Sequence, residues 1–185
     1  MKKGLRRATI TDARITKSQC PAGARPTRIG CMETRTLIAR YHTGFDAVVA
    51  SLDGITAEEL DRTIPGEWSA RQIVHHLADS ETRSFLRLRQ VLAEEVARID
   101  AYDENLWAKQ SWYGAPIDLS LAVLRAVREA TGQLIETLSE EQWLRSGTHS
   151  ESGPFGATTW LEWYSDHPHA HADQILRARQ GYPES

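Results

Sequence analysis

The chain contains few cysteines, prolines and glycines, and it has no long apolar run. Its 185 residues include 2 cysteines, 7 prolines and 12 glycines, and 41% of the residues are hydrophobic. This composition argues against a fibrous or low-complexity chain and leaves enough apolar side chains for one packed core. No stretch approaches the roughly 18 apolar residues of a membrane span, and the amino terminus lacks the apolar segment of a secretory signal. We therefore expect one cytoplasmic globular domain without a membrane partner.

The net charge of −3 hides an uneven distribution of charge along the chain. Residues 1–31 contain eight lysines and arginines and one aspartate, which leaves 14 basic against 24 acidic residues in the remainder. Because binding to a phosphate backbone requires patches of lysine and arginine, the acidic remainder argues against nucleic acid as a partner. Residues 1–31 also lack apolar periodicity, so we expect a basic disordered tail followed by a folded domain at residues 32–185.

Both cysteines, Cys20 and Cys31, belong to the expected tail. A disulfide is not expected in a reducing cytosol, and a catalytic thiol would need a histidine or a helix N-terminus beside it to lower its pKa. The expected folded domain therefore has no cysteine nucleophile of its own.

Helical periodicity dominates the chain from Met32 onward, since apolar residues recur at spacings of three and four. The pattern predicts four long helices, and Ser69 with Gln72 forms the clearest helix start, a capping box. A second capping box, Thr56 with Glu59, opens a short turn of helix. The predicted long helices are one through Leu37–Leu52 that Gly54 ends, one from Ser69 to about Val96, one from Asp118 or Ser120 to about Leu138, and one from about Thr159 to about Arg179. No alternating segment is long enough for a sheet, so an all-α four-helix bundle is the simplest architecture.

Two of the predicted connections are long. Each spans about 20 residues, whereas connections in helix bundles usually need 2–8. They contain residues 102–107 and residues 148–154. Long ordered loops in a compact bundle usually cover a site, and the alternative is that Trp107, Trp112 and Trp143 simply pack these loops against the bundle.

Histidine is the residue type that points to chemistry. Five of the 7 histidines fall in two clusters, His75 with His76 in the second long helix and His167, His169 and His171 in the fourth. His167 and His171 lie one turn apart on the same helix face, while His169 points away from both. Two such imidazoles can share a metal ion, and a third from a neighbouring helix would leave an open position for water or substrate. Periodicity does not decide which of His75 and His76 is that third ligand.

Pro168 occupies an awkward position between His167 and His171. It cannot donate a hydrogen bond to the carbonyl of Tyr164, and proline in a helix interior costs about 3 kcal/mol. We expect the helix either to bend at Pro168 or to restart there with Asp166 as its N-cap.

The segment 66–80, GEWSARQIVHHLADS, resembles the second-helix motif of the DinB/YfiT-like superfamily of metal-dependent enzymes. Residues 102–107, 148–149 and 167–175 are similar to that family in order and spacing, so the resemblance covers about residues 32–180. It implies an up-down-down-up bundle, often a homodimer, with a site at one end between helices. The resemblance also implies that the metal ligands are His76, His167 and His171. Zinc and nickel are the divalent ions that best suit three imidazoles.

The first hypothesis for the function is a low-molecular-weight-thiol S-transferase. A metal held by three histidines can lower the pKa of a small thiol and present the thiolate to an electrophilic small molecule. This chemistry needs no nucleophile from the protein. The resemblance is consistent with it, because the family includes bacillithiol- and mycothiol-dependent enzymes, and glutathione would present the same sulfur.

Two other hypotheses remain open. The same ion could lower the pKa of water and make the protein a metal-dependent hydrolase, which would need a general base. The available carboxylates are Asp79, Glu81, Asp103 and Glu104, although each could instead be solvated or orient an N–H group. In the third hypothesis the protein is a non-catalytic interaction or sensor bundle whose metal only links the helices.

Overall fold

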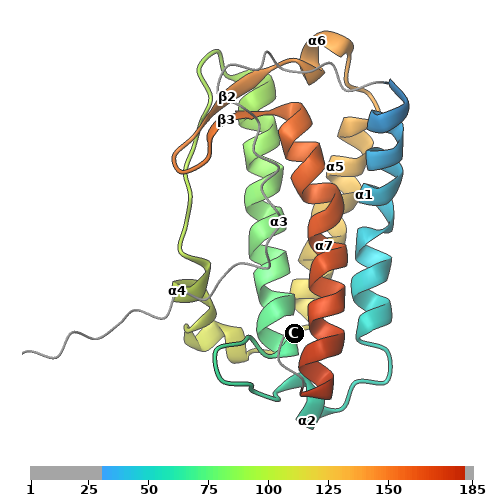
Figure 1. Ribbon diagram of the computed structural model, residues 1–185, viewed down its shortest axis with the longest axis vertical. Helices are drawn as coiled ribbons and strands as arrows, with labels where there is room; N and C mark the ends of the chain where they lie inside the picture. The colour runs from blue at the N-terminus through green and yellow to red at the C-terminus, as the bar shows by residue number, and fades with distance from the viewer. Residues whose placement is uncertain (1–30, 182–185) are drawn as a thin grey trace, which may run out of the picture.

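Four long helices packed side by side form the body of the protein (Figure 1). The structure is a computed structural model that describes residues 31–181. The long helices are α1 (Cys31–Ser51), α3 (Ala70–Ala93), α5 (Asp118–Ile135) and α7 (Ala157–Gln180). The predicted all-α bundle is confirmed.

The helices follow the expected up-down-down-up topology. In Figure 1, α1 and α7 run from the upper end of the bundle to the lower end, whereas α3 and α5 run in the opposite direction. Helices α1 and α3 both pack against α5 and α7, so they occupy opposite corners of the bundle. The antiparallel pair α3 and α7 therefore forms one side of the bundle, and this pair carries the two histidine clusters.

The helix boundaries follow local sequence signals to within a few residues. Both halves of the Ser69 and Gln72 capping box are formed at the start of α3, and the Thr56 capping box opens α2 (Ala57–Leu60). Helix α1 ends at Ser51, three residues before Gly54, which adopts a left-handed φ of 61° in the turn that follows. The ends of α3 and α5 lie about three residues before their expected positions, which is the usual uncertainty of a boundary read from sequence.

The bundle also carries a small sheet that the sequence pattern did not predict. A three-stranded sheet is made by β1 (Arg98–Ile99), β2 (Ser146–His149) and β3 (Gly153–Gly156), with β1 parallel and β3 antiparallel to the central β2. Strands of two to four residues are too short to show an alternating pattern, and β2 and β3 contain glycine and proline, which disfavour strands. The sheet joins the two long connections to each other at one end of the bundle.

The remaining short elements also lie in the long connections. They are α4 (Glu104–Ala108) and the 3₁₀ turn η1 (Ser111–Gly114) in the first, and α6 (Glu140–Trp143) in the second. The tail was predicted at residues 1–31, and residues 1–30 of it lie outside the described residues. Cys31 is already the first residue of α1, one residue before the expected boundary.

Helix α7 is continuous through Pro168, so the alternative of a restart capped by Asp166 was wrong.

None of the helices in residues 31–181 is long and apolar enough to cross a membrane.

A polar layer divides the core of the bundle into two apolar clusters. The cluster nearer the sheet includes Leu88, Ile135 and Trp160, and the cluster nearer α2 includes Ile73, Leu124 and Ile175. Between them, each long helix contributes a polar or small residue that is buried. These buried residues are Gly44, Ser80, Glu81, Ser84, Arg128, Thr131 and Ser165. Polar groups are costly to bury, so apolar packing alone does not explain why these polar side chains lie in the core.

Candidate metal centre

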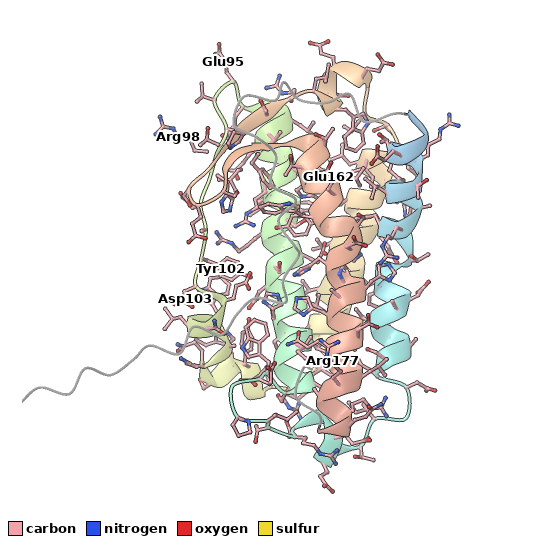
Figure 2. The ribbon with its side chains drawn as sticks, in the orientation of Figure 1. Glu95, Arg98, Tyr102, Asp103, Glu162 and Arg177 are labelled. Carbon is pink, nitrogen blue, oxygen red and sulfur yellow. The ribbon has the colours of Figure 1, made fainter. Side chains whose placement is uncertain are left out.

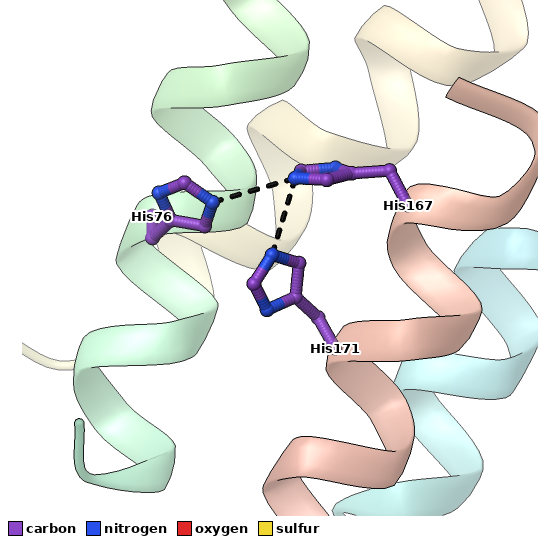
Figure 3. Close-up of side chains that lie close together, drawn as sticks. All are labelled: His76, His167 and His171. Atoms are coloured by element: carbon purple, nitrogen blue, oxygen red, sulfur yellow. Dashed lines mark hydrogen bonds between the residues drawn. The ribbon is translucent and has the colours of Figure 1, made fainter. Parts of the chain in front are cut away.

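Three histidine side chains from two helices converge beside the polar layer (Figure 3). The Nε2 atom of His167 lies 3.4 Å from Nε2 of His76 and 3.1 Å from Nε2 of His171. The three residues offer nitrogen atoms that all lie within 4.8 Å of one another. We call His76, His167 and His171 the histidine trio. The fold thus brings together the three ligands that the family resemblance implies.

The spacing of the trio suits a single metal ion. Three nitrogens bound at about 2.0–2.1 Å in a tetrahedral arrangement would lie about 3.3–3.4 Å apart. The two short Nε2 to Nε2 distances, 3.4 and 3.1 Å, are close to that value. An ion held by these three nitrogens would keep one coordination position for another molecule, as catalytic sites do and closed structural sites do not.

The surroundings of His76 and His171 favour neutral imidazoles, which is the form that binds metal. Burial, followed by the neighbouring imidazoles of His171 and His167, holds the pKa of His76 well below its usual value of 6.5. Burial and the neighbouring His167 lower the pKa of His171 to about 3. Protons therefore compete weakly with a metal ion for these two nitrogens near neutral pH.

Two further side chains hold the trio in place. The side-chain oxygen of Gln174 accepts a hydrogen bond from Nδ1 of His171 at 2.7 Å, which leaves Nε2 of that imidazole free to bind a ligand. The indole ring of Trp68 lies 4.7 Å from the ring of His76 and stacks 6.5 Å from that of His171. Trp68 is in turn fixed by its Nε1–H, which donates to Asn105 of α4 at 3.2 Å. The first long connection therefore reaches the trio through α4.

A buried ion pair lies behind His167. The guanidinium group of Arg128 donates to Glu81 at 2.7 Å, and the two side chains are 4% and 0% exposed. Nδ1 of His167 is 3.9 Å from the same Glu81 oxygen, and both this Nδ1 and the second Glu81 oxygen are buried without a hydrogen-bond partner. Arg128 also donates to the backbone carbonyl of Tyr41, so residues of α1, α3 and α5 meet behind the trio.

Arg128 also explains how α7 accommodates Pro168. The carbonyl of Tyr164 is the group that Pro168 leaves without its helical donor, and Nη1 of Arg128 lies 3.4 Å from it. On the neighbouring helix α1, Gly44 leaves room for this arrangement. A Cβ atom at Gly44 would lie 2.7 Å from Nη2 of Arg128 and 3.0 Å from Cγ of Pro168.

The two histidines that adjoin the trio in sequence point elsewhere. The ring nitrogens of His75 lie 2.8 Å from the Ser120 hydroxyl and 3.0 Å from the carbonyl oxygen of Ala115, both near the start of α5. Nε2 of His169 lies 3.1 Å from the carbonyl oxygen of Arg40 on α1. Both act as structural hydrogen-bonding groups that face α5 and α1.

Most of the candidate carboxylates are engaged by the protein itself. Asp103 is the N-cap of α4 and accepts from the backbone N–H of Leu106 at 2.9 Å. Asp79 accepts from the hydroxyl of Tyr113 at 2.8 Å, and burial raises the pKa of its carboxyl group. Glu81 is paired with Arg128.

The charge of Glu104 acts on three tyrosines, Tyr102, Tyr113 and Tyr164. It contributes, after burial, to raising the pKa of Tyr102, and it has smaller effects in the same direction on Tyr113 and Tyr164. These three tyrosines come from different parts of the chain, and the ring of Tyr164 packs 5.8 Å from that of His167. Among the four candidates, Glu81 is the one that lies beside His167, at 3.9 Å from its Nδ1.

Sequence reasoning overlooked Arg128 and Gln174, for which weak signals exist. Arg128 interrupts the stripe of Leu124 and Ile135 on α5 at a position where helical periodicity expects an apolar residue. A charged residue at such a position indicates a buried partner. Gln174 follows His171 by three residues, the spacing at which two side chains on one helix meet.

Comparisons with known proteins agree on one family. The sequence model of the DinB superfamily matches residues 40–175. The protein named "Putative metal-dependent hydrolase YfiT" from Bacillus subtilis is 33% identical over 139 residues, which cover 71% of this chain and 77% of that protein. A relative from Oceanobacillus iheyensis with the same descriptive name is 28% identical over 160 residues, which cover 84% of this chain and 92% of the relative.

A solved structure extends this similarity to the fold. The structure of YfiT, described as a probable metal-dependent hydrolase with an unusual four-helix bundle topology, matches with a TM-score of 0.77 and 29% sequence identity. The match covers 88% of this chain and 97% of that one.

Proposed function

The chain belongs to the DinB superfamily, and from this premise we propose that it is a metal-dependent enzyme acting on small molecules. His76, His167 and His171 would hold one divalent ion. The observation that carries the proposal is the convergence of their three Nε2 atoms at distances of 3.4 and 3.1 Å. Zinc and nickel suit such a set of neutral imidazoles.

We further propose that the reaction is the transfer of a low-molecular-weight thiol to an electrophile. When bound, the ion supplies Lewis acidity that lowers the pKa of a thiol from its usual value of about 8.5. A thiolate made in this way is reactive without a general base. This fits a site in which Asp79, Glu81 and Asp103 are already hydrogen-bonded to Tyr113, Arg128 and a backbone N–H group.

The chain's own residues would orient the ligands and shield the site. Gln174 fixes the tautomer of His171 by accepting from its Nδ1–H group. Trp68 covers two of the imidazoles with an apolar ring, which excludes water from that side. The hydrogen bond that Trp68 donates to Asn105 links Trp68 to the first long connection.

Hydrolysis is the second candidate, and two observations favour it. The relatives from Bacillus subtilis and Oceanobacillus iheyensis carry the name of metal-dependent hydrolases. Glu104 is the carboxylate that would serve as the base, since its charge acts on the pKa of Tyr164, whose ring packs 5.8 Å from that of His167. The metal site is the same in both candidates, so only the nucleophile differs.

The metal site can be tested independently of the reaction. Elemental analysis of the purified or reconstituted protein should find about one divalent ion per chain. His76→Ala, His167→Ala and His171→Ala should each lower this content, and His169→Ala serves as the matched control because His169 faces α1. An absence of bound metal after reconstitution with zinc and with nickel would contradict the proposal.

The two candidate reactions need a second experiment. Bacillithiol, mycothiol and glutathione should each be incubated with a chlorinated nitroarene or an epoxide, with the metal-free protein as control. Faster conjugation by the metal-loaded protein with at least one thiol supports the transferase. Metal-dependent cleavage of simple esters or amides, without any effect of a thiol, would instead establish the hydrolase.

A further inference from the structure

Two arginines of α3, Arg83 and Arg87, donate to the same carbonyl oxygen, that of Asp100. Nη2 of Arg83 lies 2.9 Å from this oxygen, and Nη2 of Arg87 lies 2.8 Å from it. The small sheet holds this segment in place, because the backbone N–H of Ser150 donates to the carbonyl of Ile99 at 2.8 Å. The two guanidinium groups are therefore fixed side by side beneath the segment that leads from β1 to α4.

Within residues 31–181 the arginine pair has no carboxylate as a counter-charge. Within residues 31–181 neither guanidinium group forms an ion pair with a carboxylate, although Arg87 is only 9% exposed and Arg83 is half-buried. Arg128, the other buried arginine of the bundle, does have a carboxylate partner in Glu81. Because burying an unpaired cation is costly, the buried Arg87 beside Arg83 indicates a counter-charge that comes from outside the described residues.

Aromatic residues hold both side chains rigid while leaving donors unused. The guanidinium carbon of Arg83 lies 4.5 Å from the ring centroid of Tyr102, which Figure 2 shows on the segment beside α3. Nη1 of Arg87 donates to the hydroxyl of Tyr164 at 2.9 Å. The Nε atoms of both arginines are buried and have no hydrogen-bond partner in the described structure. A rigid, planar guanidinium group is suited to the paired oxygens of a carboxylate or a phosphate.

His149 adds a neutral donor near the pair. Its Nδ1 accepts from the backbone N–H groups of Glu151 and Ser152 at 3.3 and 3.4 Å, so its proton is on Nε2. His149 pairs with Ile99 across β1 and β2, one residue from the Asp100 carbonyl that both arginines contact. Burial, followed by the charge of Arg87, lowers the pKa of its imidazole.

The arginine pair lies on the same side of α3 as the histidine trio. Positions 76, 83 and 87 are separated by seven and four residues, so their side chains share one helix face. Seven residues correspond to about 10 Å along the helix axis, and side chains lean toward the helix N-terminus, which is the direction of His76. Tyr164 connects the two groups, since its hydroxyl accepts from Arg87 and its ring packs 5.8 Å from that of His167.

We propose that Arg83 and Arg87 bind an anionic group, a carboxylate or a phosphate, of the small molecule that reacts at the histidine trio. That anion supplies the counter-charge that the arginine pair lacks. Its distance from the reacting atom is set by the spacing along α3, about 10 Å from His76 to Arg83 and about 16 Å from His76 to Arg87. The proposal rests on the proposed function for the reaction, but the binding of the anion requires no metal.

The test measures anion binding to the full chain after metal has been removed with a chelator and the chelator dialysed away. Isothermal titration is carried out with succinate, with inorganic phosphate and with succinamide, a neutral analogue of succinate. We expect succinate or phosphate to bind at least tenfold more tightly than succinamide. The stronger of the two anions identifies the acidic group as a carboxylate or a phosphate. Arg83→Gln and Arg87→Gln should each remove the preference for the anion.

Two further variants separate anion binding from folding and from general charge. Arg87→Lys keeps the charge but loses the planar pair of donors, so it should fold and retain only part of the affinity. Arg125→Gln removes an exposed arginine of α5 that packs on Phe45 and should leave anion binding unchanged.

Equal binding of succinamide and both anions to the wild-type chain would overturn the proposal, as would unchanged anion binding in folded Arg83→Gln. A chain that binds metal but shows no anion preference contradicts this proposal alone. A chain that shows the anion preference but binds no metal contradicts the proposed function alone.

Discussion

A carboxylate oxygen of Glu81 lies 3.9 Å from Nδ1 of His167, and neither Nδ1 nor the second oxygen of Glu81 has another hydrogen-bond partner. Metal ligands of this kind usually donate their second ring N–H to a carboxylate or a carbonyl, which fixes the tautomer and raises the affinity for the ion. A small movement of His167 would close the contact with Glu81. We therefore regard Glu81 as a residue that positions His167, and Glu81 is itself held by its ion pair with Arg128.

This relationship predicts that Glu81→Gln lowers metal affinity by about 10- to 100-fold, because the amide keeps the shape but loses the charge. Affinity is measured by competition with a chelator, and circular dichroism checks the fold. Glu129→Gln, at an exposed position on α5, is the control and should bind metal as the wild type does. A folded Glu81→Gln variant with wild-type affinity would show that His167 needs no help from this carboxylate.

Substitution of His75 should lower the stability of the protein, whereas substitution of the adjacent His76 should remove metal binding. His75→Ala removes contacts with the Ser120 hydroxyl and the Ala115 carbonyl, which should lower the free energy of unfolding by roughly 1–3 kcal/mol and leave metal content unchanged. His76→Ala should abolish metal binding. Urea denaturation of the metal-free proteins and elemental analysis of the loaded proteins measure the two effects. A loss of metal in folded His75→Ala equal to that in His76→Ala would contradict the assignment.

Much of the bundle could be predicted because its signals are local. Capping boxes at Thr56 and Ser69 and apolar residues at helical spacing locate helices through interactions within a few residues. The pairing of His167 with His171 follows in the same way from the geometry of one helix. The choice of His76 over His75 does not, since both flank the apolar stripe of α3. That choice came from the family resemblance, and the structure brings His76 into the trio.

What the sequence did not predict depends on contacts between distant segments. The pairing of Ile99 with His149 joins short strands that carry no alternating pattern. Arg128 supplies a donor near the carbonyl that Pro168 leaves free, although 40 positions separate the two residues in the sequence. Such compensation is decided by tertiary packing, which local propensity does not contain.

The pH dependence of stability should report the histidine trio in the metal-free protein. The pKa values of His76 and His171 are lowered on folding, so below pH 6.5 the unfolded chain takes up protons at these positions before the folded chain does. The contribution to stability is therefore complete above pH 6.5 and is lost as the pH falls from 6.5 toward 3. Each histidine should add roughly 1 kcal/mol of destabilisation per pH unit in this range.

Urea denaturation of the chelator-treated protein between pH 7.5 and 5 measures the change in the free energy of unfolding per pH unit. We expect this slope to be roughly 1 kcal/mol per pH unit for each of the two histidines. The double variant His76→Gln with His171→Gln should show a smaller slope, because its side chains do not titrate. His169→Gln is the matched control and should keep the wild-type slope. Identical slopes in the wild type and the double variant would contradict the expectation.

The close approach of α1 to α7 at Gly44 predicts that Gly44→Ala destabilises the bundle. The added Cβ atom would lie 2.7 Å from Nη2 of Arg128 and 3.0 Å from Cγ of Pro168, so at least one of these groups must move. Arg128 is held by Glu81 and by the Tyr41 carbonyl, and it therefore has little freedom to withdraw. Overpacking of this kind costs about 1–3 kcal/mol.

The expected drop in the free energy of unfolding of Gly44→Ala is measured by urea denaturation. Gly114→Ala is the control, because a Cβ atom there meets no atom within 4 Å. Metal affinity should fall together with stability in Gly44→Ala, since a displaced Arg128 disturbs the Glu81 carboxylate that faces His167. A Gly44→Ala variant as stable as Gly114→Ala would show that α1 and α7 can separate at this point without cost. In that case the contacts of Arg128 with Glu81 and with the Tyr41 carbonyl would not be what holds the helices together in the polar layer.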